Sequence, residues 1–140
     1  MKRFWKLVSV KDLVFGTVIF AIVVLMTVVQ SADKVKVTFG EESMDVKTAK
    51  YAMNIPYDMI DTVDIMDMPD RGEVVDGADD MAVRTGMWKN DAWGEYYVCA
   101  DLKVSKCIVM HLNNDSVFVV SRKDVEETQF VYDTLCSYLK

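Results

Sequence analysis

The chain has 140 residues, which is room for one domain of ordinary size. Hydrophobic residues make up 51% of the chain and charged residues 27%, a composition that excludes an intrinsically disordered protein. Residues 33–140 carry 12 Lys and Arg against 21 Asp and Glu, so nucleic acid is not an expected partner and close docking on anionic lipid is disfavoured.

The N-terminal part of the chain is predicted to be a membrane anchor. Residues 13–29 read LVFGTVIFAIVVLMTVV and hold no charge. With residues 30–32 the segment approaches the roughly 20 residues that cross a bilayer core, and its backbone groups can be satisfied in lipid only by a helix. We therefore expect a short basic segment over residues 1–12, a transmembrane helix in contact with the lipid bilayer over 13–32, and a folded domain over 33–140.

The charges beside the apolar segment predict its orientation. Two basic residues, Lys34 and Lys36, follow it closely, and four precede it: Lys2, Arg3, Lys6 and Lys11. The positive-inside rule then predicts a single-pass protein of the cell membrane with a cytoplasmic N-terminus and an extracytoplasmic C-terminal domain. A cleaved signal peptide is the alternative, because cleavage before Ala32 is compatible with the sequence. The apolar run exceeds the usual core of about 7–15 residues, which favours an uncleaved anchor.

The folded domain is predicted to be mainly β. Alternating or β-rich segments indicate about seven strands: residues 34–39, 44–53, a strand in which Ile60, Val63 and Ile65 point inward, 81–88, 93–102, 106–112 and 116–121. Asn113-Asn114-Asp115 predicts a tight hairpin turn between the last two strands. The stretch that leads to Asp80 is predicted to be a loop, because Pro69, Gly72 and Gly77 interrupt it.

The end of the chain changes to a helical period. Asp124 is a suitable N-cap, and Glu127 stands three residues later as in a capping box. An apolar stripe follows at helical spacing: Thr128, Val131, Tyr132, Leu135 and Leu139. We therefore expect one amphipathic C-terminal helix that closes an open end of the β structure.

Several blocks of sequence resemble the bacterial pleckstrin-homology (PH)-like domain family, in particular members on small membrane-anchored proteins of Gram-positive bacteria. The matching positions are Ile55-Pro56-Tyr57, Ile60, Val63, Gly86, Asn90, Trp93-Gly94, Tyr96 and Glu126-Glu127-Thr128. The resemblance covers residues 34–140. It implies a PH-like barrel of about seven antiparallel strands capped by the C-terminal α-helix, and it implies membrane association. It implies no chemistry, because such barrels serve chiefly as binding scaffolds.

Acidic residues occur at every third position from Asp58 to Asp79. Neither a helix nor a strand gathers that spacing on one face. The local candidates for a calcium site are Asp70, Glu73, Asp76, Asp79 and Asp80, although the dense DxDxDG pattern is absent. An extracytoplasmic calcium-dependent binding domain is therefore an alternative function. The other interpretation is a solvated strand edge and loop, where charges prevent edge-to-edge aggregation.

The sequence predicts neither an enzyme nor a bound cofactor. No nucleotide, nucleophile-elbow or HExxH signature occurs, and the lone His111 falls in a predicted strand. Phosphoinositide binding is not expected, because the first hairpin turn carries Glu41 and Glu42. Cys99, Cys107 and Cys136 lack zinc spacing; they are three free thiols, or one disulfide forms on neighbouring strands.

Aromatic residues give the best clue to function. Trp88 and Trp93 flank a predicted hairpin turn, and Tyr96 follows. These rings either form cross-strand pairs that stabilise the hairpin or form an exposed patch that binds a partner. Together with the resemblance, they predict a membrane-anchored, non-enzymatic interaction module. Its expected partner is another membrane or envelope protein, bound through the aromatic patch or as an extended peptide along an open sheet edge.

Overall fold

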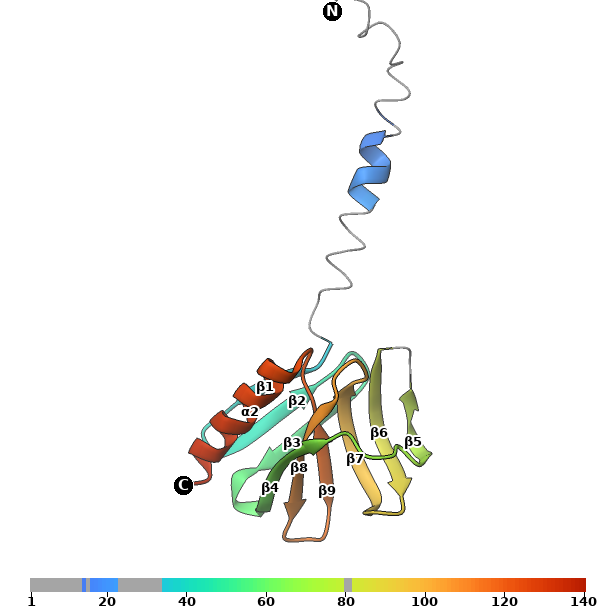
Figure 1. Cartoon of the computed structure of the whole chain (residues 1–140). Coiled ribbons are helices and arrows are strands. Elements are labelled where there is room, and N and C mark those ends of the chain that lie inside the picture. Colours follow the sequence, from blue (N-terminus) through green and yellow to red (C-terminus); the bar gives the residue numbers. More distant parts are fainter. Residues whose placement is uncertain (1–13, 15, 23–33, 80–81) are drawn as a thin grey trace, which may run out of the picture. The chain divides into compact units, whose positions relative to one another are not determined.

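The computed structural model describes residues 14, 16–22, 34–79 and 82–140. The chain divides into two compact units, Met1–Ala32 and Asp33–Lys140. In the first unit residues 14 and 16–22 are helical, whereas the predicted basic segment and the rest of the predicted anchor lie outside the described residues (Figure 1). None of the helices in the described part of the chain is long and apolar enough to cross a membrane.

The second unit consists of two β-sheets and one α-helix (Figure 1). The first sheet is a meander of three strands: β1 (Lys36–Phe39), β2 (Ser43–Lys47) and β3 (Ala52–Pro56). A 3-10 turn, η1 (Tyr57–Met59), leads into the second sheet, which has the order β4-β8-β9-β7-β6-β5. Its strands are β4 (Ile60–Asp67), β5 (Glu73–Asp79), β6 (Val83–Asn90), β7 (Gly94–Asp101), β8 (Lys106–Leu112) and β9 (Val117–Val120).

The predicted class, mainly β with a C-terminal helix, is confirmed, but the predicted closed barrel of seven antiparallel strands is wrong. The described residues form nine strands in two separate sheets, and β7 pairs with β9 in parallel. The predicted hairpin at Asn113–Asp115 explains the parallel pair. It turns β9 back into the space between β8 and β7, where β9 is antiparallel to β8 and so runs in the same direction as β7.

Two predicted segments also differ from the structure. Residues 44–53, expected as one strand, contribute to β2 and β3, which are joined by a turn where the Thr48 amide donates to the Tyr51 carbonyl at 2.8 Å. The expected loop before Asp80 contains β5. Gly77 lies so close to β6 that a Cβ atom there would stand 2.2 Å from the Thr85 carbonyl oxygen. The glycine that suggested a loop therefore marks a close approach of two strands.

The second sheet is buried on both faces at its inner strand β8. On β8, Ile108 and Met110 belong to a core that also includes residues of the first sheet and the helix, whereas Cys107 and Val109 belong to a second core on the opposite face. This explains why residues 107–110 form a continuous apolar run instead of alternating with polar residues.

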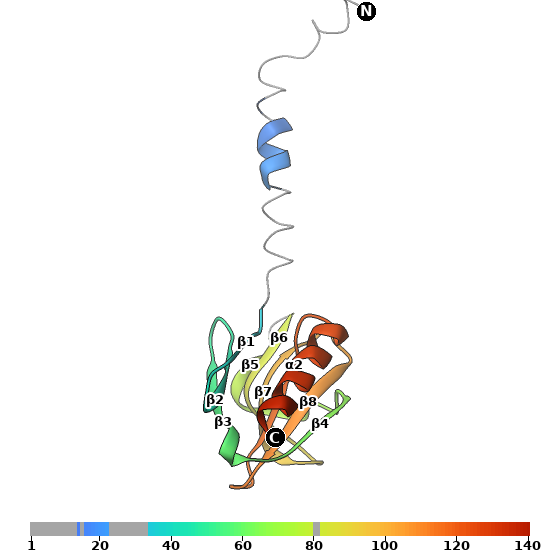
Figure 2. The same ribbon diagram turned by 90° about the vertical axis from the view of Figure 1, so that its left-hand side faces the viewer.

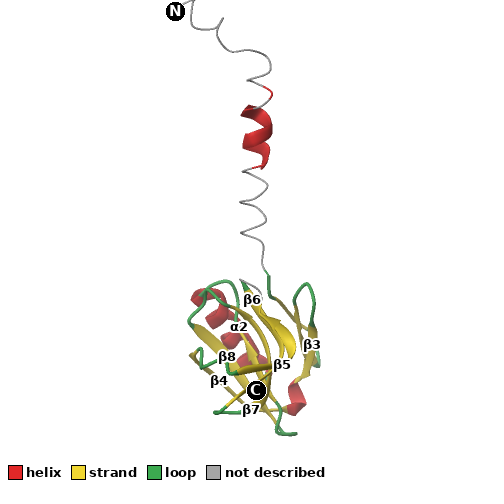
Figure 3. Cartoon of the chain, turned by 90° about the vertical axis from the view of Figure 1, so that its right-hand side faces the viewer, coloured by secondary structure: helices red, strands yellow, loops and turns green. Residues whose placement is uncertain are grey.

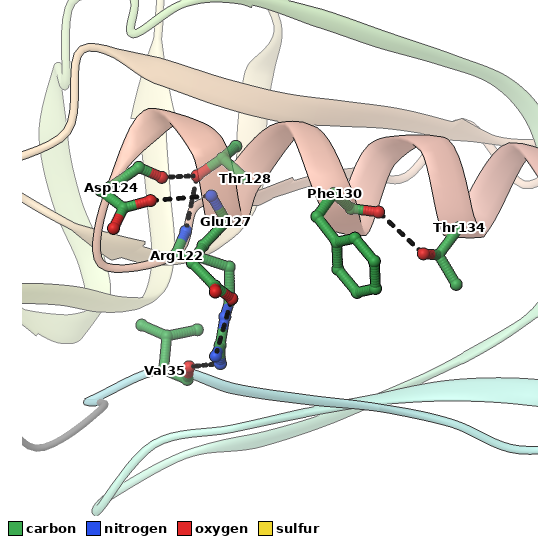
Figure 4. A network of polar contacts seen from close by, with 7 residues as sticks. All are labelled: Val35, Arg122, Asp124, Glu127, Thr128, Phe130 and Thr134. Atoms are coloured by element: carbon green, nitrogen blue, oxygen red, sulfur yellow. Dashed lines mark hydrogen bonds and ion pairs between the residues drawn. The ribbon is translucent and has the colours of Figure 1, made fainter.

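The helix α2 (Val125–Tyr138) closes the first core and buries Thr128, Val131 and Leu135. Figure 2, in which α2 faces the viewer, shows the helix beside the first sheet. The predicted cap is confirmed, because the Asp124 carboxylate accepts a hydrogen bond from the Glu127 amide at 2.7 Å. Arg122 fastens this helix start to the first residues of the domain: its guanidinium donates to the Val35 carbonyl, and its amide donates to the Thr128 hydroxyl at 3.0 Å (Figure 4).

Candidate binding groove

The aromatic residues proposed to bind a partner lie in the second core. Trp88 is opposite Tyr96 on β6 and β7, and their exposed fractions are 4% and 2%. Trp93 is half-buried and meets the Tyr96 ring edge to face, with ring centroids 5.3 Å apart. Of the two interpretations of this cluster, the structure favours cross-strand pairing, because Trp88 and Tyr96 do not reach the surface.

The aromatic cluster supports a connection that we call the crossing segment, residues 68–72. This segment joins β4 at one edge of the second sheet to β5 at the opposite edge, and Figure 1 shows it running across the face of the sheet. The Tyr96 hydroxyl donates to the Arg71 carbonyl at 2.6 Å, and the Asn90 side chain donates to the Asp70 carbonyl at 3.1 Å. The crossing segment and the aromatic rings therefore cover the second core together.

A cation is buried beside the same cluster. Arg84 is 8% exposed, and its guanidinium lies 5.0 Å from the centre of the Trp88 ring, a cation–π arrangement. Burial raises the pKa of Tyr96, while the neighbouring Arg84 acts in the opposite direction. Among the described residues no carboxylate forms an ion pair with Arg84. We regard this group as part of the second core.

The acidic residues do not converge. Those at 61, 64 and 67 lie on β4, and those at 73, 76 and 79 lie on β5, so the two groups are at opposite edges of the second sheet. Asp79 pairs with Arg71 at 2.8 Å and Asp67 with Lys106 at 2.7 Å. Asp80 lies outside the described residues, and the described ones contain no group of three or more acidic, His or Cys residues that could hold a metal ion. The interpretation as solvated strand edges fits these positions.

The three cysteines are free thiols. Cys99 faces the first core and Cys107 the second, and β9 lies between their strands, so a disulfide between these two is excluded in this fold. Burial raises the pKa of Cys99 from its ordinary value of 9.0 to about 12 and that of Cys107 to about 11. Both thiols stay protonated at neutral pH and are poor nucleophiles.

A groove of about 390 Å³ lies between β3 and the face of the second sheet that carries β6, β7 and β9. Figure 3, which views the domain from the β5 side, shows β3 alongside this part of the sheet. The residues that line the groove are Tyr51, Ala52, Met53, Asn54, Asp76, Gly86, Met87, Tyr97, Cys99 and Phe118. The sequence did not predict this site, because it joins residues 51–54 to strands that begin roughly 20 to 65 positions later.

The floor of the groove is apolar. Tyr97 and Phe118 are register partners on the parallel strands β7 and β9, and their rings stack with centroids 5.0 Å apart. Met87 is the register partner of Tyr97 on β6. Gly86, beside it, has a positive φ of 91° and contributes no side chain. The groove therefore lies above a stacked aromatic pair in which Tyr97 is 40% exposed and Phe118 is half-buried.

One wall of the groove is the outer edge of β3. The Tyr57 amide donates to the Glu42 carbonyl at 3.0 Å, and the Thr48 amide donates to the Tyr51 carbonyl at 2.8 Å, so odd-numbered residues from 51 to 57 direct their backbone groups toward β2. The amide and carbonyl groups of Ala52 and Asn54 must then point outward. Pro56 ends this short ladder because it has no N–H group.

The chemistry of the groove suits binding better than catalysis. Of the described residues that line it, Asp76 carries a carboxylate and Cys99 a buried thiol, and neither has a basic partner there. An activated nucleophile needs such a base within hydrogen-bond reach. A short unpaired strand edge above an apolar floor is instead a surface to which another chain can add.

Comparison with known proteins found no match among family models, curated proteins or solved structures.

Proposed function

We propose that this chain is a membrane-anchored, non-enzymatic interaction module, which binds an extended segment of another membrane or envelope protein. One observation carries the proposal: the groove combines the unpaired outer edge of β3 with the partly exposed Tyr97–Phe118 pair. An extended segment can satisfy both features at once. Its backbone pairs with β3, and every second side chain points toward the floor.

The size of the groove predicts a weak interaction. Two outward-facing residues, Ala52 and Asn54, offer four backbone groups, and each hydrogen bond made contributes about 0.5–1.5 kcal/mol. Burial of one large apolar side chain adds about 1.5–3 kcal/mol. Association itself costs about 4–15 kcal/mol in lost freedom of motion. The sum leaves little net affinity for a free peptide in solution.

Membrane anchoring compensates for this weakness. The apolar segment 13–32, with the basic residues before it, is expected to hold the chain in the cell membrane with the domain on the outer side. Two proteins in one membrane meet at a high effective concentration, so a weak contact between them is sufficient. The groove therefore fits a partner that is itself fixed in or near the membrane.

Site-directed photo-crosslinking in intact membranes tests this function. A benzophenone side chain is placed in the full chain at Ala52, on the groove wall, and in a control at Glu126, on the exposed side of α2. We expect a discrete protein adduct from position 52 and not from position 126. Identical adducts from both positions, or lipid adducts alone at position 52, would contradict the proposal.

A further inference from the structure

Tyr97 differs from its neighbours on β7. Tyr96, Val98 and Cys99 are fully buried, yet Tyr97 is 40% exposed and stacks on the half-buried Phe118. Two half-buried methionines, Met53 and Met87, flank this pair in the groove. Methionine side chains adapt to irregular shapes. This part of the floor is therefore suited to receive one large apolar side chain.

Gly86, which also lines the groove, allows β5 and β6 to approach each other closely. A Cβ atom at this position would stand 2.4 Å from the Asp76 carbonyl oxygen and 2.5 Å from the Gly77 Cα atom, so β5 and β6 approach each other here without side chains between them. The close approach also brings β5, with Asp76, to the border of the groove. An apolar subsite and a carboxylate are thus neighbours.

The Asp76 carboxylate has no ion-pair partner among the described residues, whereas Asp79 on the same strand is paired with Arg71. The wider surface reinforces its charge, because residues 33–140 carry nine more acidic than basic residues. Such a field attracts basic segments and repels acidic ones. Both the local and the global charge therefore favour a cation at this end of the groove.

We infer, on the basis of the proposed function, that the groove selects an extended polypeptide segment in which a large apolar side chain is accompanied by a nearby Lys or Arg. The apolar side chain covers Tyr97 and Phe118, and the basic side chain pairs with Asp76. A peptide fits better than a lipid tail for two reasons. An acyl chain cannot pair with the outward backbone groups of Ala52 and Asn54, and an anionic headgroup is repelled by the acidic domain.

Binding of synthetic peptides to the full chain in lipid nanodiscs tests this selectivity. The reference probe is a labelled nine-residue peptide of alternating Thr and Val with a central Phe and one Lys two positions away. Three variants replace the Lys by Glu, replace the Phe by Ala, or methylate the backbone nitrogens on the pairing edge. Fluorescence anisotropy should show at least fivefold weaker binding for the Glu peptide and about tenfold weaker binding for the other two.

Two protein variants separate the subsites. Asp76→Asn should abolish the preference for Lys over Glu and keep the preference for Phe over Ala. Tyr97→Ala should abolish the preference for Phe over Ala and keep the preference for Lys over Glu. Glu126→Gln removes one charge from the exposed side of α2 and should change neither preference. Thermal unfolding of each variant checks that the fold is intact. If Asp76→Asn keeps the preference for Lys, or if all four peptides bind equally, the inference is wrong.

The outcomes also distinguish this inference from the proposed function. A protein adduct from position 52 together with no preference among the peptides leaves the proposed function standing and overturns the selectivity. A labelled fatty acid that competes with the reference peptide, and whose binding is lost in Tyr97→Ala, overturns the choice of a peptide as occupant.

Discussion

The position of the crossing segment predicts that two glycine-to-alanine substitutions lower the free energy of unfolding by very different amounts. Gly72 and Gly94 have nearly the same positive φ angles, 71° and 69°. A left-handed backbone costs an alanine about 1 kcal/mol at either position. The surroundings differ: a Cβ atom at Gly72 would lie 1.8 Å from the Lys89 carbonyl oxygen, whereas nothing lies within 4 Å at Gly94. Gly72→Ala therefore carries an additional steric cost that Gly94→Ala lacks.

That steric cost can be relieved only by moving the crossing segment away from β6. The movement breaks the hydrogen bonds from Tyr96 to Arg71 and from Asn90 to Asp70, each contributing about 0.5–1.5 kcal/mol. It also exposes part of the second core. We expect Gly72→Ala to lower the free energy of unfolding by about 3–5 kcal/mol and Gly94→Ala by about 1 kcal/mol.

Urea denaturation of the full chain in detergent, followed by tryptophan fluorescence, measures both values because Trp88 and Trp93 lie beside the crossing segment. Tyr96→Phe is a second check, since it removes one hydrogen bond and leaves the ring in place, and about 1 kcal/mol should be lost. Equal destabilisation by the two alanine substitutions would refute the close approach of the crossing segment to β6.

Three further outcomes follow from the structure. Asp124→Ala should destabilise the chain by about 1 kcal/mol and reduce the helical circular dichroism signal, because the cap on Glu127 is lost; no change would show that the cap contributes nothing. Millimolar calcium or chelator should leave the melting temperature unchanged, and a rise with calcium would revive the acidic-loop alternative. Burial raises the pKa of Cys99 from 9.0 to about 12, so its unfolded thiol loses a proton above pH 9 and its folded thiol does not. Stability should therefore fall as the pH rises from 9 to 12, less steeply in Cys99→Ala.

The features that the sequence predicted well depend on local signals. The cap at Asp124, the apolar stripe of α2 and the hairpin turns near Asn113 and Asn90 each depend on residues that are close in the chain. Turn chemistry and periodicity act over a few positions, so one sequence is sufficient to detect them.

The features that were missed depend on contacts between distant segments. The parallel pairing of β7 with β9 follows from where the last hairpin inserts, and no residue near Tyr97 indicates its partner Phe118. The PH-like pattern implied an antiparallel barrel, which contributed to the wrong prediction of closure. Trp88 and Tyr96 were expected either on the surface or in a pair, and only the position of the crossing segment shows that they are covered.

Most of the regularly spaced acidic residues lie on strands at the edges of the second sheet. In the described part of the chain four strands are sheet edges: β1, β3, β4 and β5. The edge strands β4 and β5 each carry three acidic residues, which discourage pairing with another chain. On β1, Phe39 stacks on Tyr138 of α2 with ring centroids 5.3 Å apart, and Lys36 adds a charge.

The outer edge of β3 has neither kind of protection. Its sequence, Ala52 to Pro56, contains no charged residue, and it borders the groove. The long edges of the larger sheet carry charges, whereas this short edge is uncharged and lies beside the aromatic floor of the groove, which supports the proposal that a chain binds there. Ala52→Lys should place a charge on that edge, and loss of binding of the reference peptide by this variant, with the melting temperature unchanged, would connect the open edge to binding.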